Sequence, residues 1–155
     1  MFVVDTNVLI YAADRDAADH AACQALLERL RSQTEPWYLT WGIVYEFLRV
    51  TTHPSIFRHP FSARDAWSFL DAVFASPGLG MLTETERHLH VMREVFAELP
   101  GLAGNVVFDI HTAVLMRENG VRSIYTNDGD FNRFPFVDVI DPVTGQRRTA
   151  SKRRG

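Results

Sequence analysis

Short apolar runs alternate with longer amphipathic stretches along this chain, and that alternation constrains its fold more than any other feature. The short runs have the β-branched and aromatic content of buried strands and lie at 2–4, 37–39, 80–82, 123–125 and 137–140. The longer stretches have helical periodicity or capping signals and lie at 6–13, 17–32, 42–51, 62–75, 85–99 and 105–118. Because parallel strands need crossover connections, the sequence predicts an α/β fold with helices on both faces of a parallel sheet.

Length and charge limit the domain organisation and the partners. The 155 residues suit one domain, expected over 1–142, followed by a basic and flexible tail over 143–155. Without the last nine residues, 11 basic and 19 acidic residues remain, a net charge of −8. A protein that holds nucleic acid through surface charge alone would be basic, so any nucleic-acid contact should be local and metal-assisted.

Cysteine content and hydropathy indicate the compartment. The single cysteine, Cys23, excludes an internal disulfide and fits a reducing environment, where we expect it as a thiol on a helix. No run reaches the roughly 18 apolar residues of a membrane span, and no basic region precedes the first apolar run. We therefore expect a cytoplasmic protein without a membrane partner.

Acidic side chains directly follow two of the predicted strands. Asp5 comes after the first strand, and Asp128 and Asp130 come after the strand at 123–125. The carboxyl ends of parallel strands form the edge where such folds bind ligands. Each position also has a purely structural interpretation, because Asp5 can cap the next helix and 127–130 has good turn chemistry.

Two further acids interrupt apolar helix faces. At helical spacing, Glu46 shares a face with Ile43, and Asp109 shares one with Met116. A carboxylate on an apolar face is costly unless it is paired or bound to a cation. The alternatives are a pairing of Glu46 with Arg49 at the rim of the fold and a helix that begins near Asp109.

The four carboxylates Asp5, Glu46, Asp109 and Asp128 together predict one metal site. If they converge without a cation, they repel one another and raise each other's pKa. Hard oxygen ligands suit Mg²⁺ or Mn²⁺, and such ions activate water and stabilise in-line phosphoryl displacement. The spacing shows no serine–histidine or cysteine-based nucleophile, which favours hydrolysis by water.

These motifs resemble the PIN domain of VapC-type toxins over residues 2–142. The resemblance rests on the run at 3–9, on Glu46 and Asp109, and on the run at 126–131. It implies a PIN-like three-layer fold and an acidic quartet of catalytic and metal-binding residues. These are Asp5, Glu46, Asp109 and Asp128, with Thr6, Asn7, Thr126 and Asp130 as supporting residues. The sequence departs from the family at Ile110, where a small residue is common, and at His111.

The resemblance also implies an activity and partners. It implies Mg²⁺-dependent endonucleolytic cleavage of RNA, with Mn²⁺ as a substitute ion. It further implies a homodimer and a cognate antitoxin that occludes the site and inserts an arginine among the carboxylates. A catalytically silent PIN-fold interaction module is the alternative, against which the four intact acids argue.

Other sites receive less support from the sequence. The histidine pairs 53/59 and 88/90 lack the cysteine or glutamate spacing of zinc sites. A dehalogenase-like phosphatase needs a second aspartate where Asn7 stands, and a lysine, of which only Lys152 exists. The aromatic run at 131–136 could stack on bases, and Trp37, Trp41, Tyr45 and Phe47 could form a groove. For both aromatic sets we expect core packing instead.

Overall fold

The computed structural model describes residues 1–99, 104 and 106–149. Its strands are β1 (Phe2–Val4), β2 (Trp37–Thr40), β3 (Leu79–Leu82), β4 (Ser123–Tyr125), β5 (Asp138–Ile140) and β6 (Arg147–Arg148). Its helices are α1 (Thr6–Ala13), α2 (His20–Ser32), α3 (Trp41–Thr51), α4 (Ala63–Phe74), α5 (His88–Glu98), α6 (Val106–Glu118) and the 3₁₀ helix η1 (Gly129–Arg133). The predicted alternation of strands and helices is therefore confirmed.

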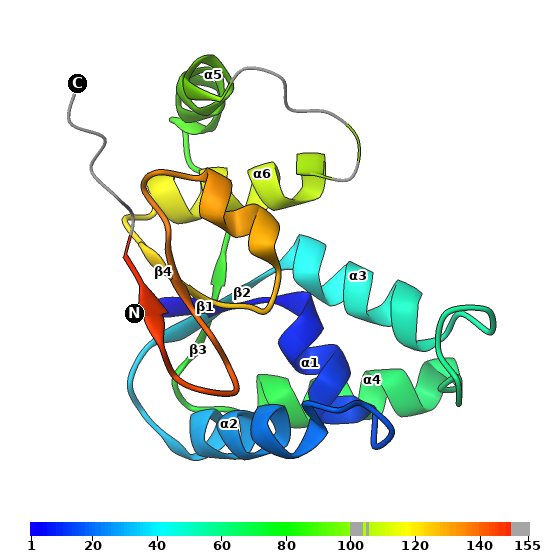
Figure 1. Cartoon of the computed structure of the whole chain (residues 1–155). Coiled ribbons are helices and arrows are strands. Elements are labelled where there is room, and N and C mark those ends of the chain that lie inside the picture. Colours follow the sequence, from blue (N-terminus) through cyan, green and yellow to red (C-terminus); the bar gives the residue numbers. More distant parts are fainter. Residues whose placement is uncertain (100–103, 105, 150–155) are drawn as a thin grey trace.

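The strands form one six-stranded sheet in the order β3-β2-β1-β4-β5-β6. The first five strands are parallel, whereas β6 runs antiparallel to β5. In Figure 1, α5 and α6 lie on one side of the sheet, and α1, α2 and α4 lie on the other. This arrangement confirms the predicted three-layer α/β fold. The parallel register brings the carboxyl ends of β2, β1, β4 and β5 to a common edge.

Two helices begin later than their periodicity predicts, and local hydrogen bonds explain both differences. The chain turns before α2, where the amide of Ala17 donates to the carbonyl of Asp14, so the helix begins at His20. Ahead of α5, the amide and hydroxyl of Thr85 donate to Glu118 of α6. These bonds tie the segment to α6, and α5 begins at His88.

The sheet continues beyond the predicted domain end at 142. Residues 141–146 form a turn, and Arg147 and Arg148 then pair with Ile140 and Val139 of β5. Two consecutive arginines lack the apolar character of a buried strand, so their pattern does not predict β6. Residues 150–155 of the predicted tail, and 100–103 and 105 of the predicted loop and helix start, lie outside the described residues.

The core confirms some aromatic predictions and corrects others. Trp37 and Phe47 are fully buried, and Phe131 and Phe134 pack in the core as expected. The prediction of core packing was wrong for Trp41 and Tyr45, which are 48% and 69% exposed. These two residues lie four apart on α3, on a face that the buried residues of that helix do not share.

Cys23 lies on a helix as predicted, namely α2, where it is buried, and burial raises the pKa of its thiol to about 11. A thiol in this environment is a poor nucleophile. Within the described part of the chain, no helix has the length and apolar character needed to cross a membrane.

Candidate active site

The sheet topology places the first predicted acid at the centre of the carboxyl edge. β1 lies between β2 and β4, and Asp5 follows β1 directly. The amide of Asp5 donates to the carbonyl of Tyr125, and the amide of Thr126 donates to the carbonyl of Ile140. The ends of β1, β4 and β5 are therefore joined where Asp5 and Thr126 leave the sheet.

A pocket of about 760 Å³ opens at this edge. All four predicted acids line it: Asp5, Glu46, Asp109 and Asp128. They come from four separate segments of the chain, namely the end of β1, α3, the first turn of α6 and the turn after β4. The remaining residues that line the pocket are Thr6, Gly42, Ile43, Tyr45, Arg49, Phe108, His111, Thr112 and Asp130.

Asp5 is buried, and three donors hold its carboxylate. Its Oδ1 accepts a hydrogen bond from the amide of Thr6 at 2.7 Å, which also caps α1. Its Oδ2 accepts from Nδ2 of Asn7 at 2.9 Å and from Oγ1 of Thr126 at 2.6 Å. Burial outweighs these bonds and raises the pKa of Asp5 to about 6. The capping and site interpretations of Asp5 are thus compatible.

Glu46 faces the pocket from α3. Its Oε2 accepts a hydrogen bond from Oγ1 of Thr6 at 3.0 Å. Its Oε1 lies 3.6 Å from Nη2 of Arg49, so the alternative rim pairing also exists. Both partners of that ion pair are largely exposed, and such pairs are weak in water. Glu46 and Arg49 both line the pocket.

Three aspartates approach one another most closely. Oxygens of Asp109, Asp128 and Asp130 all lie within 4.8 Å of one another. Burial, and next the charge of Asp128, raise the pKa of Asp109 to about 7. The amide of Asp130 donates to Oδ1 of Asp128 at 2.8 Å, which caps η1 and fixes the turn. Asp130, predicted only as a supporting residue, therefore belongs to the tightest carboxylate group.

A divalent cation fits this donor set. Every acidic side chain at the pocket offers hard carboxylate oxygens, the donors that Mg²⁺ and Mn²⁺ prefer. Besides burial, repulsion by the neighbouring carboxylates raises the pKa of Asp109, and a bound cation relieves repulsion of this kind. Among the described residues, no histidine or cysteine joins a comparable group.

The family model of the PIN domain matches residues 2–137, most of the chain and the whole of this pocket. The chain belongs to the PIN domain family. Ribonuclease VapC43 of Mycobacterium tuberculosis is 36% identical over 146 residues, which cover 94% of this chain and 98% of that protein. Ribonuclease VapC48 of the same organism is 30% identical over 141 residues, covering 91% and 97%. This PIN domain is therefore of the VapC type.

Solved structures show the same fold. The complex of VapBC2 from Rickettsia felis with a DNA fragment from their promoter gives a TM-score of 0.63 at 18% identity, covering 89% of this chain and 96% of that one. Mycobacterium tuberculosis VapC20, described as a sarcin–ricin loop cleaving toxin, gives 0.62 at 20% identity, covering 88% and 97%.

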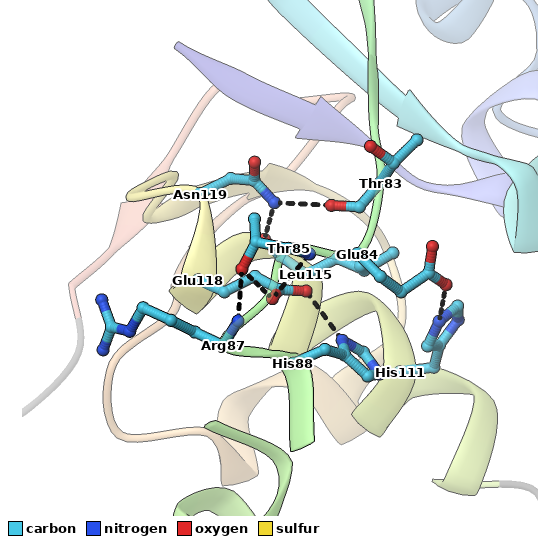
Figure 2. A network of polar contacts seen from close by, with 9 residues as sticks. All are labelled: Thr83, Glu84, Thr85, Arg87, His88, His111, Leu115, Glu118 and Asn119. Carbon is cyan, nitrogen blue, oxygen red and sulfur yellow. Dashed lines mark hydrogen bonds and ion pairs between the residues drawn. The ribbon is translucent and has the colours of Figure 1, made fainter. Parts of the chain in front are cut away.

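A polar network fixes α6 of this PIN domain against the segment after β3 (Figure 2). The Glu118 side chain is fully buried; it accepts from the amide and hydroxyl of Thr85 at 3.2 and 2.8 Å and contacts Nδ1 of His88 at 2.8 Å. On the same helix, His111 contacts Glu84 at 3.1 Å. The network therefore positions the helix that carries the third acid of the quartet.

Several pocket residues were not assigned to the site by sequence reasoning. Tyr45 and Phe108 stand on the rim, 69% and 71% exposed, and His111 and Arg49 lie beside them. Tyr45 was assigned to the core, and His111 was noted only as a departure from the family pattern. The nearby acids at 46 and 109 were the available signal, because residues one to three positions away share their helical turns.

Proposed function

We propose that this VapC-type PIN domain is a Mg²⁺-dependent endoribonuclease and the toxin of a toxin–antitoxin pair. The observation that carries the proposal is the convergence of Asp5, Glu46, Asp109 and Asp128 in one pocket. The relatives named ribonucleases cover nearly the whole chain and support the same activity. The proposed catalytic residues are these four acids.

Asp109 and Asp128, with Asp5 and Glu46, would hold the ion, and the position of Asp130 adds it to the candidate ligands. When bound, such an ion makes water a stronger nucleophile near neutral pH and stabilises charge on the phosphoryl oxygens. Mn²⁺ offers the same oxygen preference and should substitute.

The supporting residues orient the carboxylates. Oγ1 of Thr126 donates to Asp5 while accepting from Nδ2 of Asn7 at 2.8 Å, so one threonine fixes both side chains. Thr6 holds Glu46 in the same way. Because these bonds exist within the folded chain, the carboxylates need little reorganisation when the phosphodiester binds.

The proposed reaction is hydrolysis by in-line attack of water on phosphorus. The bond between phosphorus and the 3′ oxygen breaks, leaving a 3′-hydroxyl and a 5′-phosphate. The purified chain should cut cellular RNA in Mg²⁺, and Asp128→Asn should lose most of that activity while keeping the fold. Intact RNA after incubation with the folded wild-type chain in both Mg²⁺ and Mn²⁺ would contradict the proposal.

The proposed protein partners are a second copy of the chain and an antitoxin. A VapBC complex among the structural relatives supports antitoxin pairing. The cluster of carboxylates suits an antitoxin arginine, because a guanidinium pairs with carboxylates in a planar fork. Light scattering should give twice the monomer mass for the isolated chain. Expression of the native operon should yield the chain with a bound partner. A free monomer in both experiments would contradict the homodimer and the antitoxin pairing.

A further inference from the structure

A second pocket, of about 390 Å³, adjoins the carboxylate pocket. Asp128 lines both pockets and marks where they meet. Along the carboxyl edge, the strand order runs from β2, which leads into α3, through β1 and β4 to β5 and β6. The two pockets therefore lie in a row along that edge, as a substrate strand crossing the acids would require.

The strand register assigns different roles to the two arginines of β6. Directly paired residues point to the same face of a sheet. Arg148 pairs with Val139, which lines the second pocket, so Arg148 shares the face of that pocket. Arg147 pairs with Ile140 and also lines the pocket, but its guanidinium donates to Ser123 and Asp138 at 2.7 and 2.8 Å.

Arg148 is therefore the cation available to a ligand in this pocket. Its side chain is exposed, and it forms no ion pair within the described part of the chain. The pocket also contains Asp141, whose Oδ1 accepts from the amides of Val143 and Thr144 at 2.7 and 3.0 Å. These turn amides engage the carboxylate and offset its repulsion of an anion.

Three carboxamides complete the polar lining. Nδ2 of Asn127 donates to Asp19 at 2.8 Å, and Nδ2 of Asn132 donates to the carbonyl of Gly129 at 2.9 Å. These bonds orient two of the amides. Among the described residues, the side chain of Gln146 forms no hydrogen bond. A carboxamide both donates and accepts, which matches the ribose 2′-hydroxyl.

We propose that this second pocket holds the ribonucleotide next to the scissile phosphodiester, with Arg148 on its phosphate and the carboxamides on its 2′-hydroxyl. The inference rests on the proposed RNA cleavage and adds the basis of RNA selectivity. Hydrolysis by water does not use the 2′-hydroxyl as a nucleophile, so preference for RNA over DNA must come from contacts. The guanidinium supplies a local cation in an acidic domain.

Fluorescence anisotropy with single-stranded RNA and DNA of about 12 nucleotides and mixed sequence tests the pocket. Binding is measured against salt in an Asp109→Asn background, which prevents turnover during titration. One phosphate contact on a single strand contributes about 0.7 to the slope of log affinity against log salt. Arg148→Ala should lower the slope by about that amount, and Arg148→Lys should retain most of it. Arg31→Ala, an exposed arginine on α2 that lines neither pocket, is the matched control and should change nothing.

Gln146→Leu tests the sugar contact separately. It should reduce the ratio of RNA to DNA affinity by about two- to tenfold, the size of one hydrogen bond, with the salt slope unchanged.

If Arg148→Ala and Arg31→Ala give the same slope while the wild-type chain cleaves RNA, the pocket assignment falls and the proposed function stands. If the wild-type chain neither binds nor cleaves RNA with Mg²⁺ or Mn²⁺, both fall. A loss of antitoxin binding on Arg148→Ala, with RNA binding intact, would make the pocket a protein contact and overturn the proposal.

Discussion

At the scale of single residues, the site carries a stability cost that depends on pH. The pKa of Asp109 rises from 3.8 to about 7 on folding. The folded chain therefore holds this proton more tightly than the unfolded chain, and the unfolding free energy falls as pH rises from about 4 through 7. A functional site commonly lowers the stability of its fold in this way, because its residues serve function and not stability.

Replacing the charge should therefore stabilise the metal-free protein. Asp109→Asn keeps the shape and removes both the buried charge and its repulsion by the other acids, so in EDTA at pH 8 its melting temperature should exceed that of wild type by a few degrees. In a domain of this size, about 1 kcal/mol corresponds to roughly 2–4 °C. The gain should shrink near pH 4.5, where the wild-type carboxyl is protonated in the folded state. Calorimetry at the two pH values measures it, and an equal or lower melting temperature at pH 8 would contradict the electrostatic account.

Thr126 should matter through the carboxylate that it holds. Its hydroxyl is buried, donates to Asp5, and accepts from Asn7 and from the amide of Asp128. Thr126→Val keeps the shape but takes one hydrogen bond from Asp5 and one from Asn7, and it leaves the Asp128 amide without this acceptor. The loss of stability should be about 1–3 kcal/mol, together with reduced RNA cleavage. Thr126→Ser retains the hydroxyl and serves as the control. Denaturant unfolding gives the stability, and full stability of the valine variant would contradict this role.

At the scale of elements, α6 depends on the buried Glu118 at its far end (Figure 2). Glu118→Ala leaves the Thr85 amide and hydroxyl and the His88 ring without their acceptor. We expect a loss of about 1–3 kcal/mol in stability, and weaker metal binding because α6 carries Asp109. Glu86→Ala, exposed on the same segment, should have neither effect. Thermal unfolding with and without Mn²⁺ distinguishes the two variants, and matching curves would show that the network does not position α6.

The elements also show what the sequence could predict. Asp5 and Asp128 were predictable because strand ends and turn chemistry are local signals. Glu46 and Asp109 were predictable because a carboxylate among apolar residues at helical spacing is conspicuous. β6 was not predictable from the sequence, because its pairing comes from a turn that brings Arg147 back to β5. The late start of α5 was not predictable either, because it depends on a contact with Glu118, which is distant from α5 in the sequence.

At the scale of the whole molecule, β6 extends the sheet beyond the expected domain end at residue 142. Removing residues 150–155 should leave the melting temperature unchanged, because the sheet is complete at Arg148. Removing 143–155 deletes β6, exposes the edge of β5 and removes the hydrogen bond from Arg147 to Asp138, so the melting temperature should fall by several degrees. Scanning calorimetry compares the two truncations, and equal values would return the boundary to residue 142.

The central claim is that converging carboxylates direct metal-dependent hydrolysis of RNA, and the chemistry of the product ends tests it most directly. RNA cut by the purified chain in Mg²⁺ should carry 5′-phosphate and 3′-hydroxyl ends, and cutting should stop in excess EDTA and with Asp5→Asn. Fragments with 2′,3′-cyclic phosphate ends, formed at an undiminished rate in excess EDTA, would show a metal-free attack by the 2′-hydroxyl and contradict the account.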